Sequence, residues 1–135
     1  MIDRIINELY RLSKKAYEQD EVPVACVIVK DGKIVSKAYN KKEKNNDLLG
    51  HAEILAIRKL CKKLNNWRLD GYEMYVTLKP CAMCMEVIKE SRIDKIYYIL
   101  DSLNINNDKK INIKKIDQSD DKFKAMITSF FKEKR

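Results

Sequence analysis

The chain has 135 residues, and its 28 Lys and Arg against 20 Asp and Glu leave a formal net charge of +8 at pH 7. A hydrophobic share of 45% is too high for a disordered chain, while a charged share of 36% argues against a membrane protein. Neither a spanning helix nor a signal peptide is expected, so we predict one cytoplasmic domain over residues 1–135. In that reducing compartment the cysteines are expected to be buried, metal-bound or catalytic rather than disulfide-bonded.

The hydrophobic pattern divides the chain into nine segments. Apolar residues three and four positions apart predict helices, and short β-branched runs predict strands. The pair Asp31-Gly32 favours a tight hairpin turn, and the polar segment 41–50 predicts a loop. In chain order we expect a helix at 2–17, strands at 22–29 and 34–40, a helix from His51 to Leu64, a strand at 72–78, a helix at 81–91, strands at 95–100 and 111–116, and a helix at 118–133.

This order of elements favours an α/β fold. We expect a three-layer α/β/α sandwich, in which helices cover both faces of a five-stranded mixed sheet. In the last helix a stripe of apolar residues is interpreted as core packed on the sheet: Phe123, Met126, Ile127, Phe130 and Phe131. Five other residues are also assigned to packing or core positions: Cys26, Cys61, Trp67, Tyr97 and Tyr98.

Two short motifs carry groups that bind metals. Cys81 and Cys84 are three apart on a predicted helix, which places their Cβ atoms about 5–6 Å apart on one face. A Cys-x-x-Cys pair alone is ambiguous because redox proteins share it, although no thioredoxin-like order of elements surrounds this one. His51, the single histidine, would alone be interpreted as a surface or capping residue.

Taken together, the two motifs predict a catalytic zinc site. Two thiolates and one neutral imidazole balance the charge of Zn²⁺ and leave the fourth tetrahedral position for water. Zinc lowers the pKa of bound water toward about 7, and the adjoining helix N-termini favour thiolate and hydroxide. Glu53 would point about 200° away from His51 on an ideal helix. It reaches the water only if His51 lies in an irregular first turn, where a carboxylate can pass a proton to a leaving amine.

The same residues form the signature H-x-E…P-C-x-x-C of zinc nucleobase deaminases. Over roughly residues 1–98 the sequence resembles the cytidine and deoxycytidylate deaminase superfamily, most of all its bacterial tRNA adenosine deaminases. The resemblance implies a cytidine deaminase-like fold with a zinc core at about 20–100. The supporting stretches are Glu21-Val22-Pro23-Val24, Asn40, Gly50 to Ile54 with Ala56, Tyr75 to Cys84, and Ser91-Arg92-Ile93.

The resemblance also implies a role for each site residue. His51, Cys81 and Cys84 would hold one zinc ion per subunit, and zinc hydroxide would attack C6 of adenine. Glu53 would shuttle protons, so that inosine and ammonia result. The substrate-binding residues would be Asn40, the Ala52 backbone N–H and Pro80. In this branch the target is the wobble adenosine of a tRNA, and the enzyme is a homodimer whose second chain helps to grip the anticodon loop.

The chain departs from the family pattern in several places. Lys79 stands where the family usually has Glu, Leu48 where it has Pro, and Gly50 where it has Ala. The segment 101–116, on the substrate-facing side in the family, is shorter and differs in sequence. A second hypothesis is therefore a deaminase of a free nucleobase, nucleoside or nucleotide, such as guanine, cytosine or deoxycytidylate. A third, a non-catalytic binding protein of the same fold, is disfavoured because Glu53 and all three ligands are present.

The positive charge is compatible with an RNA partner, because Lys and Arg side chains neutralise phosphates. One cluster lies between Ile54 and Asp70, where a single acid accompanies five bases. We interpret this cluster first as a solvated helix face. Its members are Arg58, Lys59, Lys62, Lys63 and Arg68.

Overall fold

The computed structural model describes residues 2–101, 112–116 and 120–134, and its elements follow the predicted order. The elements are α1 (Ile2–Glu18), β1 (Ala25–Lys30), β2 (Lys33–Tyr39), α2 (Ala52–Leu64), β3 (Glu73–Leu78), α3 (Ala82–Ser91), β4 (Lys95–Leu100), β5 (Asn112–Lys115) and α4 (Asp120–Lys134). Within these ranges no helix is both long enough and apolar enough to cross a bilayer.

The described strands form one mixed sheet in the order β2-β1-β3-β4-β5. β1 is antiparallel to β2 and β3, whereas β3, β4 and β5 are parallel. The predicted hairpin is confirmed: Asp31 and Gly32 have φ angles of 50° and 78°, as a type I′ turn requires. The predicted five-stranded mixed sheet is therefore confirmed, including its weakest strand, β5.

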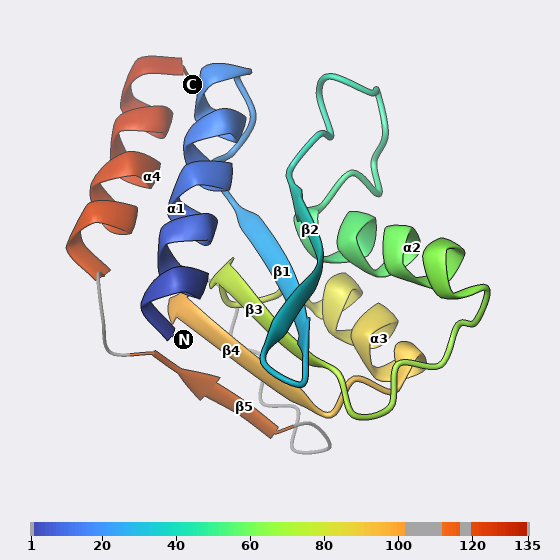
Figure 1. Ribbon diagram of the computed structural model, residues 1–135. Helices are drawn as coiled ribbons and strands as arrows, with labels where there is room; N and C mark the ends of the chain where they lie inside the picture. The colour runs from blue at the N-terminus through green and yellow to red at the C-terminus, as the bar shows by residue number, and fades with distance from the viewer. Residues whose placement is uncertain (1, 102–111, 117–119, 135) are drawn as a thin grey trace.

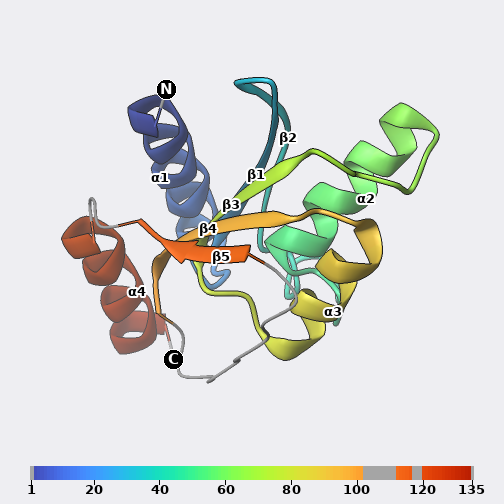
Figure 2. The same cartoon turned by 90° about the horizontal axis from the view of Figure 1, so that it is seen from below.

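Two helices cover each face of the sheet (Figures 1 and 2). Helices α1 and α4 pack on one face, where Leu9 and Phe123 are buried in one cluster with Val27 of β1 and Ile99 of β4. Helices α2 and α3 cover the other face, where Leu60 and Ile88 pack against Met74 of β3. This arrangement is the predicted three-layer sandwich. It leaves the active-site motifs at the ends of the second pair of helices.

Some predicted boundaries were wrong by a few residues. The first strand begins at Ala25 rather than Val22, because the Val24 N–H bonds to the Val22 carbonyl in a turn and Pro23 has no N–H for a strand ladder. The third helix begins at Ala82, with Cys81 as its N-cap. Residues 102–111 and 117–119, which include most of the segment 101–116 and the expected start of the last helix, lie outside the described residues.

The burial predictions were correct for some side chains and wrong for others. Cys26 and Tyr98 are buried, and Tyr97 stacks on Tyr75. Phe131 is 51% exposed because the buried face of α4 is narrower than its apolar stripe. Trp67 is 54% exposed in the segment after α2, and Cys61 is only partly buried. The interpretation of Phe131 as a core residue is therefore wrong. Cys61 packs at the margin of the core, and Trp67, expected to be a packing residue, is mostly exposed.

Candidate active site

Three metal-binding side chains from two helix starts converge at one point. The ligand atoms of His51, Cys81 and Cys84 all lie within 4.8 Å of one another. His51 directs Nδ1 toward the Sγ of Cys84, at 3.6 Å. The structure thus brings together the three residues that the two motifs predict as ligands.

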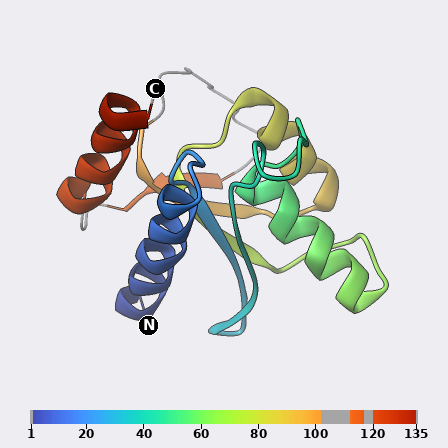
Figure 3. The same cartoon turned by 90° about the horizontal axis from the view of Figure 1, so that it is seen from above.

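Local helix geometry explains this convergence. His51 and Cys81 are the N-caps of α2 and α3, both in extended backbone conformation. Neither side chain caps its own helix, so both remain directed toward the cluster. The loop 41–50 lies over the start of α2 (Figures 1 and 3). Two helix N-termini therefore meet at the cluster, and their partial positive charge favours anions such as thiolates.

Glu53 lies beside this cluster although it follows His51 by only two residues. His51 is extended, with φ −80° and ψ 141°, so the two side chains are not separated by the rotation of a regular helix. Glu53 is 4% exposed and lines the same cavity as His51 and Cys81. His51 thus lies outside the regular helix, as the sequence analysis required if Glu53 is to reach the same site.

Burial dominates the electrostatics of these groups. It raises the pKa of Glu53 to about 7, and it raises the pKa of the Cys84 thiol well above its usual range, with a further contribution from the nearby Glu53 charge. Burial and the charge of Lys42 lower the pKa of His51. Each shift favours the neutral form of its group.

A bound zinc ion fits this donor set. Sulfur and imidazole nitrogen are preferred zinc ligands, and three protein ligands leave one position open for a reacting molecule. A divalent cation among these atoms would reverse the burial effect by stabilising the Cys81 and Cys84 thiolates. The chemistry of the residues present thus matches a catalytic rather than a structural metal site.

Asn40 and Ala52, two predicted substrate contacts, are bonded to each other. The Ala52 N–H donates to Oδ1 of Asn40 at 2.8 Å, which fixes the amide at the cavity wall. Pro80 is buried. Its neighbours Lys79 and Cys81 line the cavity, but Pro80 itself does not. Asn40 therefore faces the cavity, whereas Ala52 and Pro80 support its walls.

Glu21 is a buried, cavity-lining residue to which the sequence analysis assigned no role. Its side chain is 1% exposed, and its carboxylate accepts hydrogen bonds from the N–H groups of Glu43 at 3.1 Å and Lys44 at 2.7 Å. It also lines the cavity that contains His51, Glu53 and Cys81, whose volume is about 270 Å³. We call this cavity the active-site cavity. Glu21 therefore anchors the loop that carries Asn40 to the floor of the cavity. A lone acid before an apolar run is a weak signal for this role.

Gly50 allows the same loop to fold back on itself. The Lys41 N–H bonds to the Gly50 carbonyl at 2.9 Å. A Cβ at position 50 would lie 2.7 Å from the backbone nitrogen of Lys42 and 2.8 Å from its Cα. Glycine is required here by close backbone approach, which explains the departure from the Ala usual in the family.

Similarity to known proteins agrees with this geometry. Over residues 2–100 the chain matches the family described as the cytidine and deoxycytidylate deaminase zinc-binding region. A tRNA-specific adenosine deaminase of Aquifex aeolicus is 49% identical over 88 residues, which are 65% of this chain and 58% of that protein. The match thus spans little more than half the length of that curated relative.

Two solved structures share the fold. One, from a study of A-to-I editing by tRNA:A34 deaminases at the wobble position, superposes with a TM-score of 0.85 at 27% identity and covers 92% of this chain and 99% of that one. A guanine deaminase of Bacillus subtilis superposes with a TM-score of 0.68 at 32% identity, over 73% of this chain and 64% of that one. Since the family match extends from α1 to the end of β4 and includes every ligand candidate, the chain belongs to the cytidine and deoxycytidylate deaminase family.

Proposed function

We propose that the chain is a zinc-dependent deaminase that converts adenosine to inosine at the wobble position of a tRNA. The observation that carries this proposal is the meeting of His51, Cys81 and Cys84 within 4.8 Å, with the Glu53 carboxylate lining the same cavity. The choice of tRNA is supported by the 49% identical relative named as a tRNA-specific adenosine deaminase.

In this proposal His51, Cys81 and Cys84 hold one zinc ion per subunit, which supplies an activated water near neutral pH. Glu53 takes a proton from that water and delivers it to N1 of the adenine ring. As the water oxygen bonds to C6, a hydroxyl forms there, and Glu53 carries the proton of that hydroxyl to the amino nitrogen, so that the C6–N bond breaks, ammonia leaves and the C6 carbonyl of inosine remains. Because Glu53 is buried, bulk water does not compete for these protons.

The cavity walls orient the base. The Oδ1 of Asn40 accepts the hydrogen bond from the Ala52 N–H, so the amide NH₂ group of Asn40 is left to donate to a ligand. The Ala52 N–H acts through Asn40, and Pro80 acts by holding the backbone that joins β3 to Cys81. A single nucleotide turned out of its stack suits a cavity of about 270 Å³ with exposed Lys42 at its rim.

A free purine base is the second candidate substrate, because the Bacillus subtilis guanine deaminase is 32% identical over the superposed part. The two candidates share the zinc apparatus and differ in what surrounds the base. A free base needs no phosphate contacts, whereas an RNA nucleotide brings flanking phosphates to the cavity mouth. Lys42 and Lys79, which line the cavity, favour the RNA substrate.

Direct assay separates the candidates. Zinc-loaded protein is incubated with a transcribed arginine tRNA anticodon stem-loop and, separately, with guanine and cytosine. The proposal predicts inosine in the RNA and no ammonia from the free bases. Ammonia from guanine without inosine in the RNA would show that the second candidate is correct. Elemental analysis of the same protein should find one zinc per chain, and Glu53→Ala should keep the zinc and lose the activity.

We also propose that two copies act together on the RNA, since a chain of 135 residues offers little surface to hold a stem-loop. Adjacent apolar residues on the loop beside the cavity, Leu48 at 70% and Leu49 at 39% exposure, support a contact there. Analytical ultracentrifugation should show a dimer that Leu48→Ser with Leu49→Ser weakens. A wild-type monomer at the concentrations used in the deamination assay would contradict this part.

A further inference from the structure

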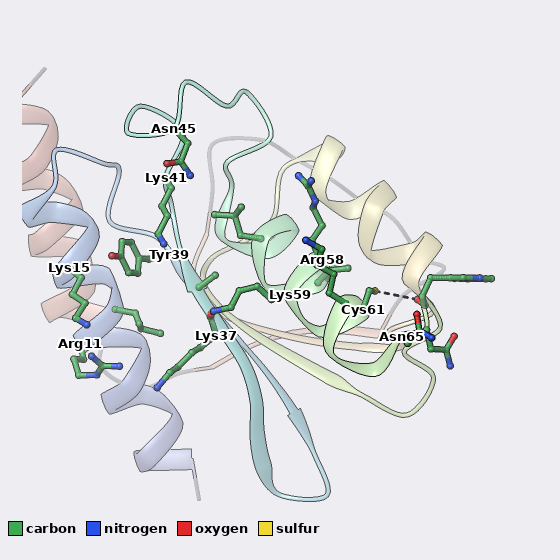
Figure 4. A pocket seen from close by; sticks show the side chains of 17 residues that line it. Arg11, Lys15, Lys37, Tyr39, Lys41, Asn45, Arg58, Lys59, Cys61 and Asn65 are labelled. Carbon is green, nitrogen blue, oxygen red and sulfur yellow. Dashed lines mark hydrogen bonds between the residues drawn. The ribbon is translucent and has the colours of Figure 1, made fainter.

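A second and larger cavity runs along the free edge of β2, between helices α1 and α2 (Figure 4). Its volume is about 940 Å³. Arg11 and Lys15 reach into it from α1, and Arg58 and Lys59 from α2 (Figure 4). We call this cavity the sheet-edge groove.

The charge of the sheet-edge groove is one-sided. Among the described residues, seven of those that line it are Lys or Arg and none is Asp or Glu. Glu8, at one margin, pairs with Arg11 and with Lys37. Lys59 donates to a backbone carbonyl instead. In the part of the chain that the structure describes, no carboxylate pairs with the other four cations of the groove, which are Lys15, Lys41, Arg58 and Lys62. The groove therefore presents positive charge that an anionic partner would neutralise.

The free edge of β2 is not open to another strand. The Nζ of Lys59 donates a hydrogen bond to the Lys37 carbonyl at 2.7 Å, across the edge. A lysine over an edge carbonyl blocks the pairing that an added strand needs. A second copy docked groove to groove would bring like charges together. Both features favour a flexible polyanion over a protein strand or a symmetric copy.

The sheet-edge groove and the active-site cavity share one wall, the segment 40–45. Asn40, Lys42 and Glu43 line the active-site cavity. Lys41 and Asn45, from the same segment, line the groove. A polymer with one unit in the active-site cavity thus reaches the groove by crossing a single loop.

The groove is also lined by an exposed aromatic ring. Trp67 lines it and is 54% exposed, with the guanidinium groups of Arg68 and Arg92 at 5.3 and 5.5 Å from the ring. Cations that follow a backbone and aromatic faces that accept bases are typical of single-stranded nucleic-acid sites. This combination suits RNA better than an acidic peptide.

We propose that the sheet-edge groove binds the phosphodiester backbone of the RNA whose target nucleotide enters the active-site cavity. Lys15, Arg58 and Lys62 contact phosphates directly, and Lys41 bridges the two cavities. This inference rests on the proposed function for the nature of the substrate. It adds a binding surface on the side of the loop 41–50 away from the candidate zinc ligands.

The test compares two variants with the same loss of charge in the zinc-loaded protein. Lys15→Gln, Arg58→Gln and Lys62→Gln are combined in the groove variant. Lys14→Gln, Lys33→Gln and Lys95→Gln, all exposed and outside the groove, are combined in the control variant. Fluorescence anisotropy measures binding of a labelled arginine tRNA anticodon stem-loop that already carries inosine at the target position, so that no turnover occurs.

The groove variant should bind this RNA about 10- to 100-fold more weakly at 0.1 M salt, and its plot of log affinity against log salt should be shallower by about two. The control variant should stay within about threefold of wild type. Equal zinc content and melting temperature in both variants exclude a folding defect. Equal RNA affinity of the two variants would overturn the inference, as would a groove variant that changes only the association state.

The inference and the proposed function fail in different ways. If wild type forms inosine in the RNA while the groove and control variants bind alike, the groove inference fails and the proposed function stands. If wild type forms no inosine but its RNA binding depends on the groove, the groove still binds RNA and the proposed function fails. Deamination and binding are measured on separate RNAs, so neither result masks the other.

Discussion

The active-site cavity and the sheet-edge groove share the segment 40–45 but are built from opposite kinds of residue. The active-site cavity, about 270 Å³, contains buried Glu21 and Glu53 and half-buried His51. The sheet-edge groove, about 940 Å³, is lined by exposed cations such as Lys15 and Arg58 and by no described carboxylate.

The difference fits the role that we propose for each region. Proton transfer requires groups held within hydrogen-bond distance and shielded from bulk water, so the active-site groups are buried and fixed by helix starts. Attraction of a polyanion acts over a screening length of about 8–10 Å and does not require burial. Five changes separate the two regions, and they are ordered by the size of the expected effect.

Removal of zinc should have the largest effect. Dialysis against a chelator should lower deamination below detection, and added zinc should restore it. The melting temperature should fall as well, because His51, Cys81 and Cys84 lose the ion that balances their buried ligand atoms. RNA affinity should remain within about threefold of the zinc-loaded value, because the sheet-edge groove contains no candidate ligand. A loss of RNA binding equal to the loss of activity would show that the two regions are not separable.

Glu53→Gln removes the proton shuttle while preserving shape. We expect kcat for inosine formation to fall about 1,000-fold, within the range for loss of a general acid-base group. Zinc content and RNA affinity should be unchanged. Glu86→Gln, an exposed acid on α3, is the matched control and should keep full activity. A fall of less than tenfold in kcat would exclude Glu53 as the shuttle.

Gly50→Ala tests the wall that the two regions share. A methyl group placed 2.7–2.9 Å from backbone atoms of Lys41 and Lys42 forces the loop to move. We expect the free energy of unfolding to fall by about 1–3 kcal/mol, as for other overpacked sites. KM should rise together with the Kd for RNA, because Asn40 and Lys41 face different cavities from this loop. Lys44→Ala, an exposed side chain of the same loop, should change stability little in urea unfolding.

Glu21→Gln tests the anchor of the same loop. The amide keeps one oxygen acceptor and places an NH₂ group against a backbone N–H, so one of the bonds to Glu43 or Lys44 is lost. We expect a loss of about 1–2 kcal/mol in the free energy of unfolding. A rise in KM larger than the fall in kcat would mark Glu21 as a positioning residue. Glu18→Gln, at the exposed end of α1, is the control, and equal effects of the two changes would contradict the assignment.

Glu8→Gln should have the smallest effect, at the margin of the groove. The hydrogen bond from Arg11 is the main reason that the pKa of Glu8 is lowered to about 2. Burial opposes this shift, and Lys37 adds to it. A lowered folded-state pKa stabilises the protein above pH 4.5, and that contribution is lost as the pH falls toward 2. For this largely surface pair we expect about 0.5–1 kcal/mol at pH 7.

The same substitution tests the groove, because it leaves Arg11 and Lys37 without a carboxylate partner. RNA affinity should rise by about twofold, as one extra charge becomes available to phosphates. Chemical unfolding at pH 7 and pH 3 checks the stability effect, and the difference between wild type and variant should shrink at the lower pH. A difference that grows on acidification would contradict the lowered pKa.

Much of the fold was predictable because its signals are local. The pair Asp31-Gly32 requires left-handed backbone wherever it joins two strands, and the α1 pattern identifies a buried face in any context. The sequence also predicted that Cys81 and Cys84 share a helix end, because a spacing of three residues alone determines that neighbourhood. His51 joined them through chemistry, as the third ligand that a zinc ion needs.

Other features depend on residues that are far apart in the chain. The role of Glu21 requires the loop at Glu43 to return beside it, and the sheet-edge groove requires α1 and α2 to flank β2. Arg58 and Lys62 are exposed, as the interpretation of a solvated helix face expects, and only the structure places them along one groove with Lys15 and Arg11. Phe131 was assigned to the core by its helical spacing and Trp67 to packing by its type, although exposure depends on what packs above a side chain.

The sequence by itself therefore determined the order of elements and the turn chemistry, since both rest on spacing within a few residues, and it indicated the ligand candidates by their chemistry. Only the tertiary structure decided which loop anchors the cavity and where the uncompensated charge collects. Those properties arise when segments tens of residues apart meet, and no local pattern encodes the meeting.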